Sequence, residues 1–517
     1  MAADSVVIPA GKLRIKGAGG PMQDGGWNLW SNAAAGDTFE AAQEGEVEIA
    51  VSAAGQPCQG VFPLAQWSLR TDAGENPVGQ PFTVGAKEFK DYSAKVRVPK
   101  GRFTVLIAFL NDAQAGGEDR NLLLKELRVS GATLLDKPPG VKELTDDGIR
   151  KHRMGTLVIQ TAPNAAVKVT MLRHEFLFGT ALGGAMWNER TPAAAREKYQ
   201  QILRENFNHA VHENELKWYH TEAQQGQFNY ADAEKMLTWC EHNNIVMRGH
   251  CVFWGIEQFV QPWIKKLDDK ALREAMEQRA KAVATRFKGR IREYDLNNEM
   301  IHGDYFAKRL GEGITKEMFG WVKAADPDAT LYVNDYSILS GGDGPRYIQH
   351  TQKLIDQGAP VGGIGCQGHF GGHIDAGHVL ATLNQLARFR LPIKVTEFDM
   401  DTKDEQTKAQ GLETLYRCCF SHPAIAGILM WGFWEGAHWK PQAALWKKDF
   451  SPTPAAEMYR KLVFDEWWTK FEGKADDKGR CEVPAFFGKH SVEADGQKAE
   501  VELPKAKGTV RVTLGKQ

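Results

Sequence analysis

Two glutamates in this sequence stand where a pair of carboxyl groups could act on one bond. Glu299 follows the short apolar run 291–296, and Glu397 directly follows the apolar run 393–396. In such a pair, one carboxyl group protonates a leaving oxygen while the other attacks carbon or activates water, as cleavage of an acetal requires. Most acidic side chains are solvated surface charges, but these two each end a strand-like apolar run. We therefore treat them as a candidate catalytic pair.

Polar and aromatic residues also gather at the ends of the neighbouring apolar runs. The end motifs are His212-Glu-Asn-Glu-Leu-Lys-Trp218, Arg248-Gly-His250 with Trp254, Asn334-Asp-Tyr336, Gly365-Cys-Gln-Gly-His369, Thr396-Glu-Phe-Asp399 and Trp431-Gly432. A histidine is ordinarily satisfied within a core, yet His250 and His369 both stand at such ends beside acidic residues. Packing alone does not require this concentration, so we expect these ends to form one site.

The elements that must position these residues alternate between short strands and longer helices after residue 176. Eight strand candidates cover residues 176–181, 208–212, 245–251, 291–296, 330–334, 363–367, 393–396 and 425–431, with helices expected over 193–207, 231–243, 270–287 and 346–357. The hydrophobic period also permits a doubly wound sheet. The count of eight and the polar strand ends favour an α/β (β/α)8 barrel, in which strands four and seven place Glu299 and Glu397 across one mouth.

The segments on either side of the barrel are predicted to be mainly β structure. Residues 1–135 carry β runs at 47–51, 95–98, 103–109 and 121–129 between turn residues, which predicts a β-sandwich domain. Residues 136–150 are expected to be a linker. The catalytic barrel with a preceding β hairpin around residues 162–164 is then expected over 151–470. The C-terminal β extension, 471–517, is expected to pair with that hairpin as a small accessory β unit.

Composition narrows the class of partner. The 517 residues include 64 Lys+Arg and 65 Asp+Glu, so the net charge of −1 favours neither nucleic acid nor an anionic membrane. The 15 tryptophans supply flat faces that suit sugar rings, although core packing is the commoner role of any one of them. The 7 cysteines have no disulfide or metal spacing. A neutral partner is therefore expected.

From about residue 150 to residue 468, these motifs in this order resemble the glycoside hydrolases of family 10. The characterised members of that family are mainly endo-β-1,4-xylanases. Glu299-Met-Ile-His-Gly303 and Gln261-Pro-Trp263 are most similar to the plant-type branch, which also carries a β segment before the barrel. The resemblance implies a retaining enzyme that needs no cofactor for catalysis and acts on xylan or xylo-oligosaccharides.

The resemblance also implies roles for individual residues. Glu299 would be the acid/base and Glu397 the nucleophile, with His369 and Asp399 keeping the nucleophile ionised and Tyr336 in support. Asn298 would hold the sugar 2-hydroxyl and Gln367 would tune the pKa of Glu299. The glycone subsites and stacking platforms would be formed by Glu213, Asn214, Lys217, His250, Trp254, Trp431 and Trp439.

Some features depart from the family pattern and leave alternatives open. Phe398 replaces a common Leu, Trp434-Glu435 replaces Ser/Thr-Asp, and the loop over 301–310 is short. These changes fall on the leaving-group side and affect fine specificity. A β-1,4-glucan-active enzyme of the same mechanism therefore stays an alternative, as does a non-catalytic xylan-binding protein, although the intact glutamate pair argues against the latter.

The N-terminal domain carries a second resemblance. Phe109-Leu-Asn-Asp112 and Glu118-Asp-Arg-Asn-Leu122 are similar to loops of calcium-dependent xylan-binding modules. The resemblance implies Asn111, Asp112, Glu118 and Asp119 as ligands of a Ca²⁺ that bridges to sugar hydroxyls, since a hard cation takes oxygen ligands. A solvated turn is the alternative. Trp27, Trp30 and Trp67 lie in Gly-rich, polar surroundings that suit carbohydrate binding.

Location and assembly follow from the expected substrate. The start Met1-Ala-Ala-Asp-Ser5 has no basic or apolar leader region, and no apolar run approaches the ~18 residues of a membrane span. Because a polymer-degrading enzyme must reach its polymer, we expect a secreted or periplasmic protein whose leader has been replaced by Met1. We expect it to act as a monomer.

Overall fold

The computed structural model describes residues 5–71 and 74–514. By their internal contacts these residues form two compact units. The first comprises the described part of residues 1–140 together with 341–344 and 375–388, and the second comprises the remainder. The N-terminal β domain lies in the first unit, while the second contains a strand–helix domain and a small β domain.

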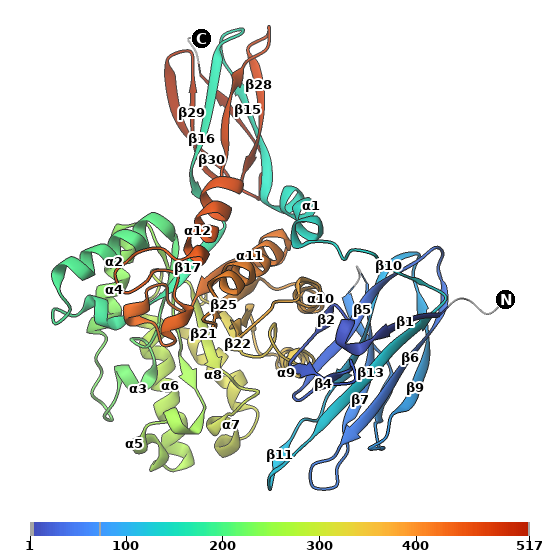
Figure 1. Cartoon of the computed structure of the whole chain (residues 1–517). Helices are drawn as coiled ribbons and strands as arrows, with labels where there is room; N and C mark the ends of the chain where they lie inside the picture. Colours follow the sequence, from blue (N-terminus) through green and yellow to red (C-terminus); the bar gives the residue numbers. More distant parts are fainter. Residues whose placement is uncertain (1–4, 72–73, 515–517) are drawn as a thin grey trace. The chain divides into compact units, whose positions relative to one another are not determined.

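The N-terminal domain consists of two antiparallel sheets packed face to face (Figure 1). One sheet has the order β3-β4-β13-β6-β9 with β1 beside β13, and the other has the order β14-β5-β10-β7-β8 with β2 beside β5. The strands are β1 (Ser5–Pro9), β2 (Ile15–Lys16), β3 (Gly19–Pro21), β4 (Trp27–Leu29), β5 (Ala33–Ala41), β6 (Gly45–Gln56), β7 (Leu64–Thr71), β8 (Gly74–Thr83), β9 (Lys90–Val98), β10 (Gly101–Phe109), β13 (Asn121–Ser130) and β14 (Thr133–Leu134).

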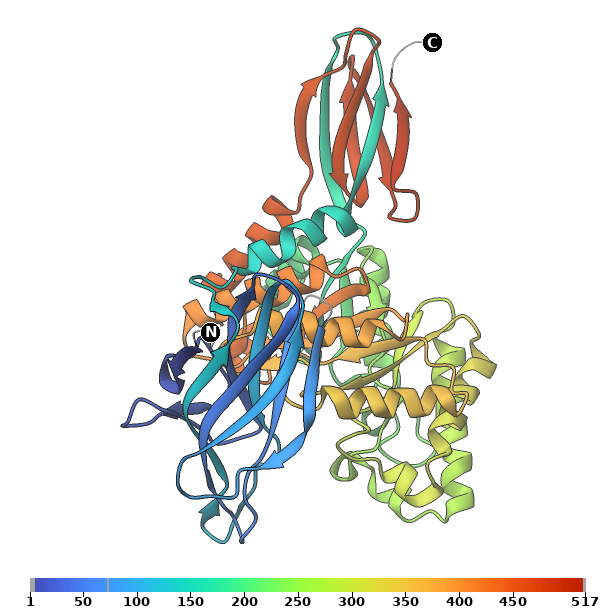
Figure 2. The ribbon, with the colours of Figure 1, turned by 90° about the vertical axis from the view of Figure 1, so that its right-hand side faces the viewer.

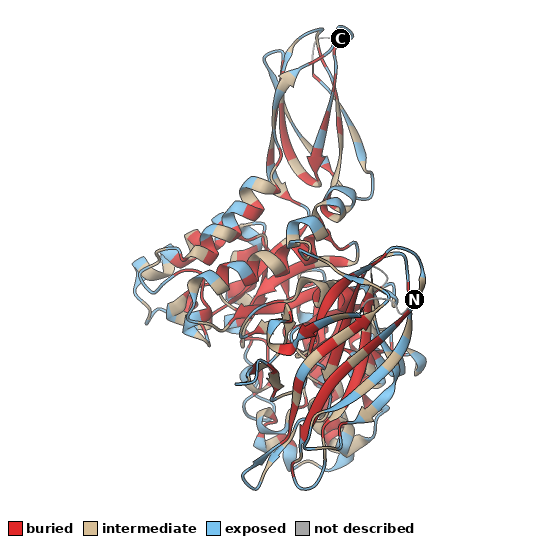
Figure 3. Ribbon diagram, turned by 45° about the vertical axis from the view of Figure 1, so that its right-hand side comes forward, coloured by how far each residue is buried: buried red, intermediate tan, exposed pale blue. Residues whose placement is uncertain are grey.

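Alternation along the strands explains why the two sheets pack. Val47, Ile49 and Val51 of β6 are buried while Glu46 and Glu48 are exposed and Ala50 is half-buried, as expected of a strand with one face in a core. They belong to the same apolar cluster as Phe103 and Val105 of β10. Buried residues accordingly follow the strands in Figure 3. The predicted β-sandwich is confirmed.

The second unit contains eight parallel strands that close into a barrel. They are β17 (Leu177–Leu182), β18 (His209–His212), β19 (Val246–Arg248), β21 (Glu293–Asn298), β22 (Thr330–Asp335), β23 (Gly363–Cys366), β25 (Ile393–Met400) and β26 (Ile425–Met430). The sheet runs continuously from β19 through β18, β17 and β26 to β21. Each strand overlaps one of the eight predicted runs, so the predicted barrel is confirmed and the doubly wound sheet is excluded.

The barrel closes between β19 and β21, and this closure depends on a glycine. Gly249 forms a parallel bridge to Tyr294, its N–H donates to Glu293 O at 3.0 Å, and its carbonyl accepts from Asp295 N at 3.0 Å. A Cβ at Gly249 would lie 2.3 Å from the Tyr294 ring. Only glycine permits this approach, and the approach brings the ends of β19 and β21 together.

Helices alternate with the barrel strands along the chain (Figure 2). They are α2 (Ala193–Asn206), α4 (Ala231–His242), α6 (Asp269–Arg286), α8 (Ile314–Ala325), α9 (Gly344–Asp356), α10 (Ala376–Ala387), α11 (Glu405–Ser421) and α12 (Pro454–Lys461). Aspartates begin three of them: Asp268 accepts from Ala271 N at 2.8 Å, Asp375 from Gly377 N at 2.9 Å, and Asp404 from Thr407 N at 2.7 Å. Among the described residues, no helix is both long and apolar enough to cross a bilayer.

The segment expected as a linker is helical over most of its length. Helix α1 (Val141–Arg153) buries Thr145, Ile149 and Arg153, one side chain per helical turn. The four-residue spacing places these three side chains on one face of the helix, and helix α1 packs on α11. Charged residues between those positions masked this periodicity in the sequence.

The hairpin predicted before the barrel is wrong. Strands β15 (Met154–Gln160) and β16 (Ala166–His174) lie in different sheets, ordered β28-β15-β31 and β27-β16-β29-β30. Leu157 of β15 and Val167 of β16 share one core between these sheets, so the strands face each other instead of pairing. Their partners come from the C-terminal segment: β27 (Lys470–Lys474), β28 (Arg480–Phe486), β29 (Gly488–Ala494), β30 (Gln497–Leu503) and β31 (Thr509–Thr513). The accessory β unit is therefore a small sandwich of its own.

Candidate active site

Glu299 lies immediately after β21 with its carboxylate held by two donors. Its Oε2 accepts from Trp254 Nε1 at 2.8 Å, and its Oε1 accepts from Gln367 Nε2 at 2.9 Å. Its backbone has a φ of 61°, which is unfavourable for a residue with a Cβ, and its N–H donates to Asn334 O at 2.9 Å. Such strain is tolerated where the surroundings fix the residue. The side chain is thereby fixed at the end of the strand.

The pKa of Glu299 is raised above its ordinary value. Burial is the main cause, and the charge of Glu397 adds to it, while the hydrogen bonds from Gln367 and Trp254 act in the opposite direction. Burial disfavours the charged form because the protein interior solvates charge less well than water. A carboxyl group with a raised pKa retains a proton to give to a leaving oxygen.

Glu397 lies within β25 and is almost wholly buried, with 4% of its surface exposed. Its Oε1 accepts from Asn334 Nδ2 at 2.9 Å, and its N–H donates to Gln367 O at 2.7 Å. Its Oε2 lies 3.4 Å from Nε2 of His369. Both carboxylate oxygens of Glu397 thus lie beside a nitrogen of a neighbouring side chain.

His369 completes the surroundings of Glu397. Burial alone would lower the histidine pKa, but Asp399 and Glu397 outweigh it and raise the pKa of His369 to about 9. Its Nδ1 lies 3.0 Å from Asp399 Oδ2, and that oxygen also accepts from Trp439 Nε1 at 2.8 Å. At neutral pH the imidazole is therefore cationic and faces the buried carboxylate of Glu397.

Asn334 was not among the predicted site residues, yet it joins three of the strands. Its Nδ2 donates to Asn298 Oδ1 at 2.8 Å as well as to Glu397, and its Oδ1 accepts from Thr396 Oγ1 at 2.7 Å. Its position at the end of the fifth strand, two residues before Tyr336, was the available signal. It orients Asn298 and Glu397 toward each other.

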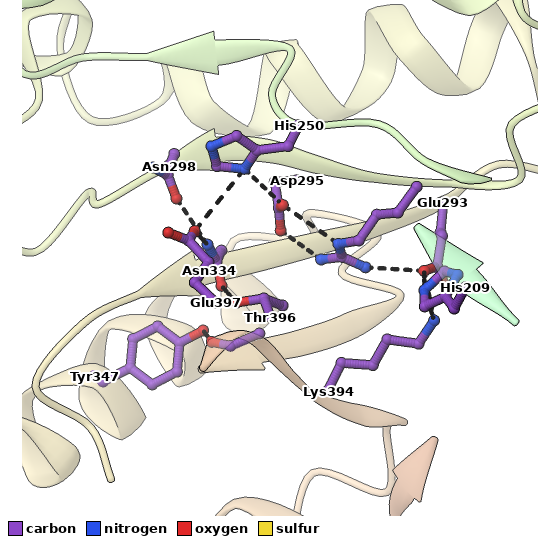
Figure 4. A network of polar contacts seen from close by, with 12 residues as sticks. His209, His250, Glu293, Asp295, Asn298, Asn334, Tyr347, Lys394, Thr396 and Glu397 are labelled. Atoms are coloured by element: carbon purple, nitrogen blue, oxygen red, sulfur yellow. Dashed lines mark hydrogen bonds and ion pairs between the residues drawn. The ribbon is translucent and has the colours of Figure 1, made fainter. Parts of the chain in front are cut away.

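A chain of buried charges continues from the site into the barrel (Figure 4). His250 Nδ1 lies 3.0 Å from Asp295 Oδ2 and 4.0 Å from Glu397 Oε1. Arg248 pairs with Asp295 and reaches Glu293 at 3.2 Å. Glu293 also lies 2.5 Å from Lys394 Nζ, which is 3.1 Å from His209 Nε2. Acidic and basic side chains alternate along the stretch from Asp295 through Arg248 and Glu293 to Lys394.

Opposite charges determine the ionisation of this network. Burial alone would raise the pKa of Glu293, but Lys394, His209 and Arg248 outweigh it and hold that pKa well below its usual range. Burial lowers the pKa of Lys394, and Glu293 opposes that shift. Removal of one member therefore leaves an uncompensated charge in the barrel. Lys394 and His209 could not be identified from local sequence patterns, because their proximity depends on barrel closure.

A second cluster lies at the ends of β18 and β26. Lys217 Nζ donates to Asn214 Oδ1 at 3.1 Å and lies 4.6 Å from the ring centroid of Trp254 and 5.8 Å from that of Trp431. The His250 ring stands edge-on to Trp431 at 5.0 Å. Polar hydrogen-bonding groups beside indole faces suit a sugar ring, which is polar at its rim and apolar on its faces.

The remaining predicted residues border these groups. Burial, followed by the charge of Glu215, raises the pKa of Glu213 to about 7. Trp439 is half exposed and stands edge-on to His369 at 5.1 Å. Tyr336 stacks on His302 at 3.6 Å, and His302 Nδ1 lies 2.6 Å from Asp335 Oδ1. The predicted residues of the barrel are thus brought together at one end of its strands.

The four predicted calcium ligands do not share one environment. Asn111 Oδ1 accepts from Leu64 N at 2.6 Å, and Glu118 Oε2 accepts from Gln59 N at 2.5 Å. Asp112 has a raised pKa, caused by burial and then by the charge of Asp119, so these two carboxylates lie near each other. Within the described ranges, no group of three or more His, Cys, Asp or Glu side chains could hold a metal ion. The structure therefore does not gather the four predicted residues into one cation site.

The tryptophans of the N-terminal domain also differ from one another. Trp67 is buried to 3% exposure in the sandwich core, so its predicted contribution to carbohydrate binding is wrong. Its strand β7 lies beside β10, and the alternation directs this side chain inward. Trp30, by contrast, is 49% exposed.

A barrel with two carboxyl groups at the ends of strands four and seven, beside aromatic and amide side chains, defines a glycoside hydrolase. The chain belongs to glycosyl hydrolase family 10, because the family model matches residues 169–462. Residues 41–143 match a Ca-dependent carbohydrate-binding module described as xylan-binding.

Curated relatives share the barrel region. Endo-1,4-beta-xylanase 2 of Arabidopsis thaliana is 36% identical over 334 residues, covering 64% of this chain and 30% of the relative. Anti-sigma-I factor RsgI6 of Acetivibrio thermocellus is 36% identical over 350 residues, covering 66% of this chain and 45% of the relative. The chain thus spans less than half the length of these relatives.

A solved structure supports the same fold. Xylanase 10B from Thermotoga petrophila RKU-1, crystallised with xylobiose, matches with a TM-score of 0.53 and 26% identity. The match covers 56% of this chain and 95% of that one. The similarity therefore concerns the barrel.

The buried charge chain yields a prediction of stability. Lys394→Met leaves Glu293 buried with fewer counter-charges, so we expect the free energy of unfolding to fall by about 3 kcal/mol. Denaturant unfolding followed by far-UV circular dichroism measures it. Lys489→Met removes an exposed pair with Glu500 and serves as the control, with no expected change in the unfolding midpoint. Small effects of equal size in both variants would contradict the role of Lys394 as a counter-charge of buried Glu293.

The donors to Glu299 yield a prediction of pH dependence. Trp254→Phe removes a hydrogen bond that lowers the pKa of Glu299, so that pKa rises further and the proton is retained to higher pH. We expect the alkaline limb of kcat/KM to move up by about half a pH unit to one unit. The control Trp263→Phe loses only a bond to the Glu222 carbonyl. A downward shift, or the same shift in the control, would refute this explanation.

Proposed function

We propose that this chain is a retaining endo-β-1,4-xylanase. The observation that carries the proposal is the contrast between its two glutamates. Glu299 has a raised pKa caused by burial, whereas Glu397 is buried among Asn334 and cationic His369. Double displacement needs this division, because one carboxyl group must give a proton while the other attacks as an anion.

In this proposal Glu397 attacks the anomeric carbon while Glu299 protonates the departing oxygen. The bond from Glu397 to the sugar replaces the glycosidic bond, and Glu299 is left ionised. Glu299 then takes a proton from a water molecule, which attacks the anomeric carbon and releases Glu397. His369 and Asp399 keep Glu397 ionised, and Gln367 and Trp254 moderate the pKa of Glu299.

The proposed substrate side uses the clusters around both glutamates. Asn298, oriented by Asn334, would hold the 2-hydroxyl next to Glu397. Glu213, Asn214, Lys217, His250 and Trp254 would contact the glycone sugars, with Trp431 and Trp439 as stacking platforms and Tyr336 in a supporting position. Xylan as the polymer is supported by the names of the relatives and by the matched binding module.

We further propose that the N-terminal domain binds xylan in a calcium-dependent manner. Asp112 and Asp119 would hold the ion with carbonyl oxygens, and the bound ion would supply coordination to sugar hydroxyls. The half-exposed Trp30 offers an aromatic face in the same domain. Binding to the polymer raises the local concentration of substrate.

Because xylan is outside the cytoplasm, we propose that the protein is secreted or periplasmic. We propose that it acts as a monomer.

Retention at the anomeric carbon is the first test of the catalytic proposal. Proton NMR during xylan hydrolysis should show the β-anomer before mutarotation, because two displacements restore the starting configuration. Initial rates on xylan should exceed those on carboxymethyl-cellulose.

Variants separate the glutamate pair from other acids near the barrel mouth. Glu397→Gln should lower kcat on xylan by about 10⁴-fold or more, since the attacking group is lost, while Glu435→Gln should retain activity. The α-anomer appearing first would sink the retaining mechanism. Faster initial rates on carboxymethyl-cellulose than on xylan would overturn xylan as the proposed substrate.

The binding domain is tested in the full chain carrying Glu397→Gln, so that the polymer stays intact. Affinity electrophoresis in xylan should show retardation with Ca²⁺ that is lost in EDTA and in Asp112→Asn, because carboxylate ligands are what Ca²⁺ requires. Glu46→Gln, an exposed partner of Lys95, is the control. Retardation that persists in EDTA and in Asp112→Asn would rule out calcium as the bridge.

A further inference from the structure

A small cavity in the barrel domain borders Asp399. Its walls include Asp399, Lys408, Leu412, Gly432 and Ala443, and its volume is about 10 Å³. One water molecule needs about this much space, and it also needs two to four polar partners. The polar groups around the cavity therefore decide whether it holds a water molecule or is merely a packing gap.

The two carboxylate oxygens of Asp399 differ in their partners. Oδ2 accepts from Trp439 Nε1 at 2.8 Å and lies 3.0 Å from His369 Nδ1. Oδ1 is buried and accepts no hydrogen bond from any residue that the structure describes. A buried carboxylate oxygen without a donor is costly, so this atom needs a further partner, and its residue lines the cavity.

His438 carries a complementary unpaired donor. Its Nδ1 accepts from Lys440 N at 3.0 Å, which places the single proton of the neutral ring on Nε2. Burial lowers the pKa of His438 to about 4, so the ring is neutral at physiological pH. Across the described ranges, Nε2 has no hydrogen-bond partner.

Gly432 connects this donor to the cavity. A Cβ at Gly432 would lie 2.9 Å from Cδ2 and 3.4 Å from Nε2 of His438, so the ring edge rests against a residue that lines the cavity. Asp399 is also the first charged group that acts on His438. The residue that carries the unpaired acceptor therefore lines the cavity, and the unpaired donor stands against another residue of its wall.

Lys408 supplies a third polar group. Its buried ammonium lies 3.0 Å from Glu405 Oε1 and donates to Ala444 O at 3.3 Å. An ammonium has three N–H groups, so one donor is left for the cavity that Lys408 lines. Donation from His438 and Lys408, with acceptance by Asp399, satisfies a single water molecule.

We propose that one ordered water molecule in this cavity links His438 Nε2 to Asp399 Oδ1, which makes His438 a positioning residue for the Glu397–His369–Asp399 group. The water donates to Asp399 and fixes the rotation of its carboxylate. Asp399 in turn orients His369 against Glu397. The positioning role of His438 rests on the proposed glycosidase function. The water site itself does not depend on that function.

A crystal structure of the ligand-free protein at about 1.5 Å tests the water site without any reference to activity. We expect one water molecule within hydrogen-bond distance of both Asp399 Oδ1 and His438 Nε2. A cavity without a water peak would overturn the proposal. An inactive protein with the water in place would instead count against the glycosidase function and leave the link intact.

Kinetics on xylo-oligosaccharides test the positioning role. His438→Leu removes the donor, and we expect kcat to fall roughly tenfold with KM within about twofold, because an unsatisfied Asp399 no longer orients His369. His438→Gln offers an amide N–H near the same place and should restore most of kcat. Ala443→Val fills the cavity without altering His438 and should reproduce the loss.

Two results would overturn the positioning role. One is a kcat of His438→Leu within twofold of the parent protein. The other is an equal loss in His438→Gln, which would indicate that the ring only fills space. If His438→Leu does not fold, Ala443→Val decides the question alone, with its thermal midpoint measured to exclude general unfolding.

Discussion

The proposed mechanism requires Glu397 to carry a negative charge inside a protein core, and much of the barrel interior is arranged around this carboxylate. Removing a carboxylate from water is costly unless donors and counter-charges replace the lost hydration. Asn334 donates to one oxygen, and cationic His369 stands beside the other. Asp399 stabilises that cation in turn, so the charge of the nucleophile is supported through two layers of side chains.

The same constraint explains the charges deeper in the barrel. His250 stands between Glu397 and Asp295, and Arg248 then links Asp295 to Glu293. From Asp295 through Arg248 and Glu293 to Lys394, each charge is adjacent to one of opposite sign. Such a network fixes the angles of the strand-end side chains as well as their ionisation, since every member makes directional contacts to its neighbours. Precise placement is required because the sugar must lie between two carboxyl groups of different protonation.

The sequence predicted the parts of this arrangement that leave a local signal. Eight apolar runs and their polar ends were sufficient for the barrel, and family motifs indicated Glu299, Glu397 and their close neighbours. Contacts across the barrel left no such signal. His209, Glu293 and Lys394 meet because β18, β21 and β25 close into a ring, and periodicity does not encode which residues then face inward together.

The errors have similar physical causes. β15 and β16 alternate as hairpin strands would, yet each pairs with C-terminal strands and they face each other across a core. Trp67 has polar neighbours in the sequence but points into the sandwich. In both cases a local pattern is compatible with two packings, and distant segments decide between them.

Trapping the glycosyl-enzyme would show directly whether Glu397 is the residue that attacks the sugar. The protein would be inactivated with a 2-fluoro-β-xylobioside carrying a good leaving group, digested and sequenced by mass spectrometry. We expect one 2-fluoroxylobiosyl group, attached to the peptide that contains Glu397 and located on that residue. A label on Glu299 or on any other residue, or hydrolysis without a trapped adduct, would contradict it.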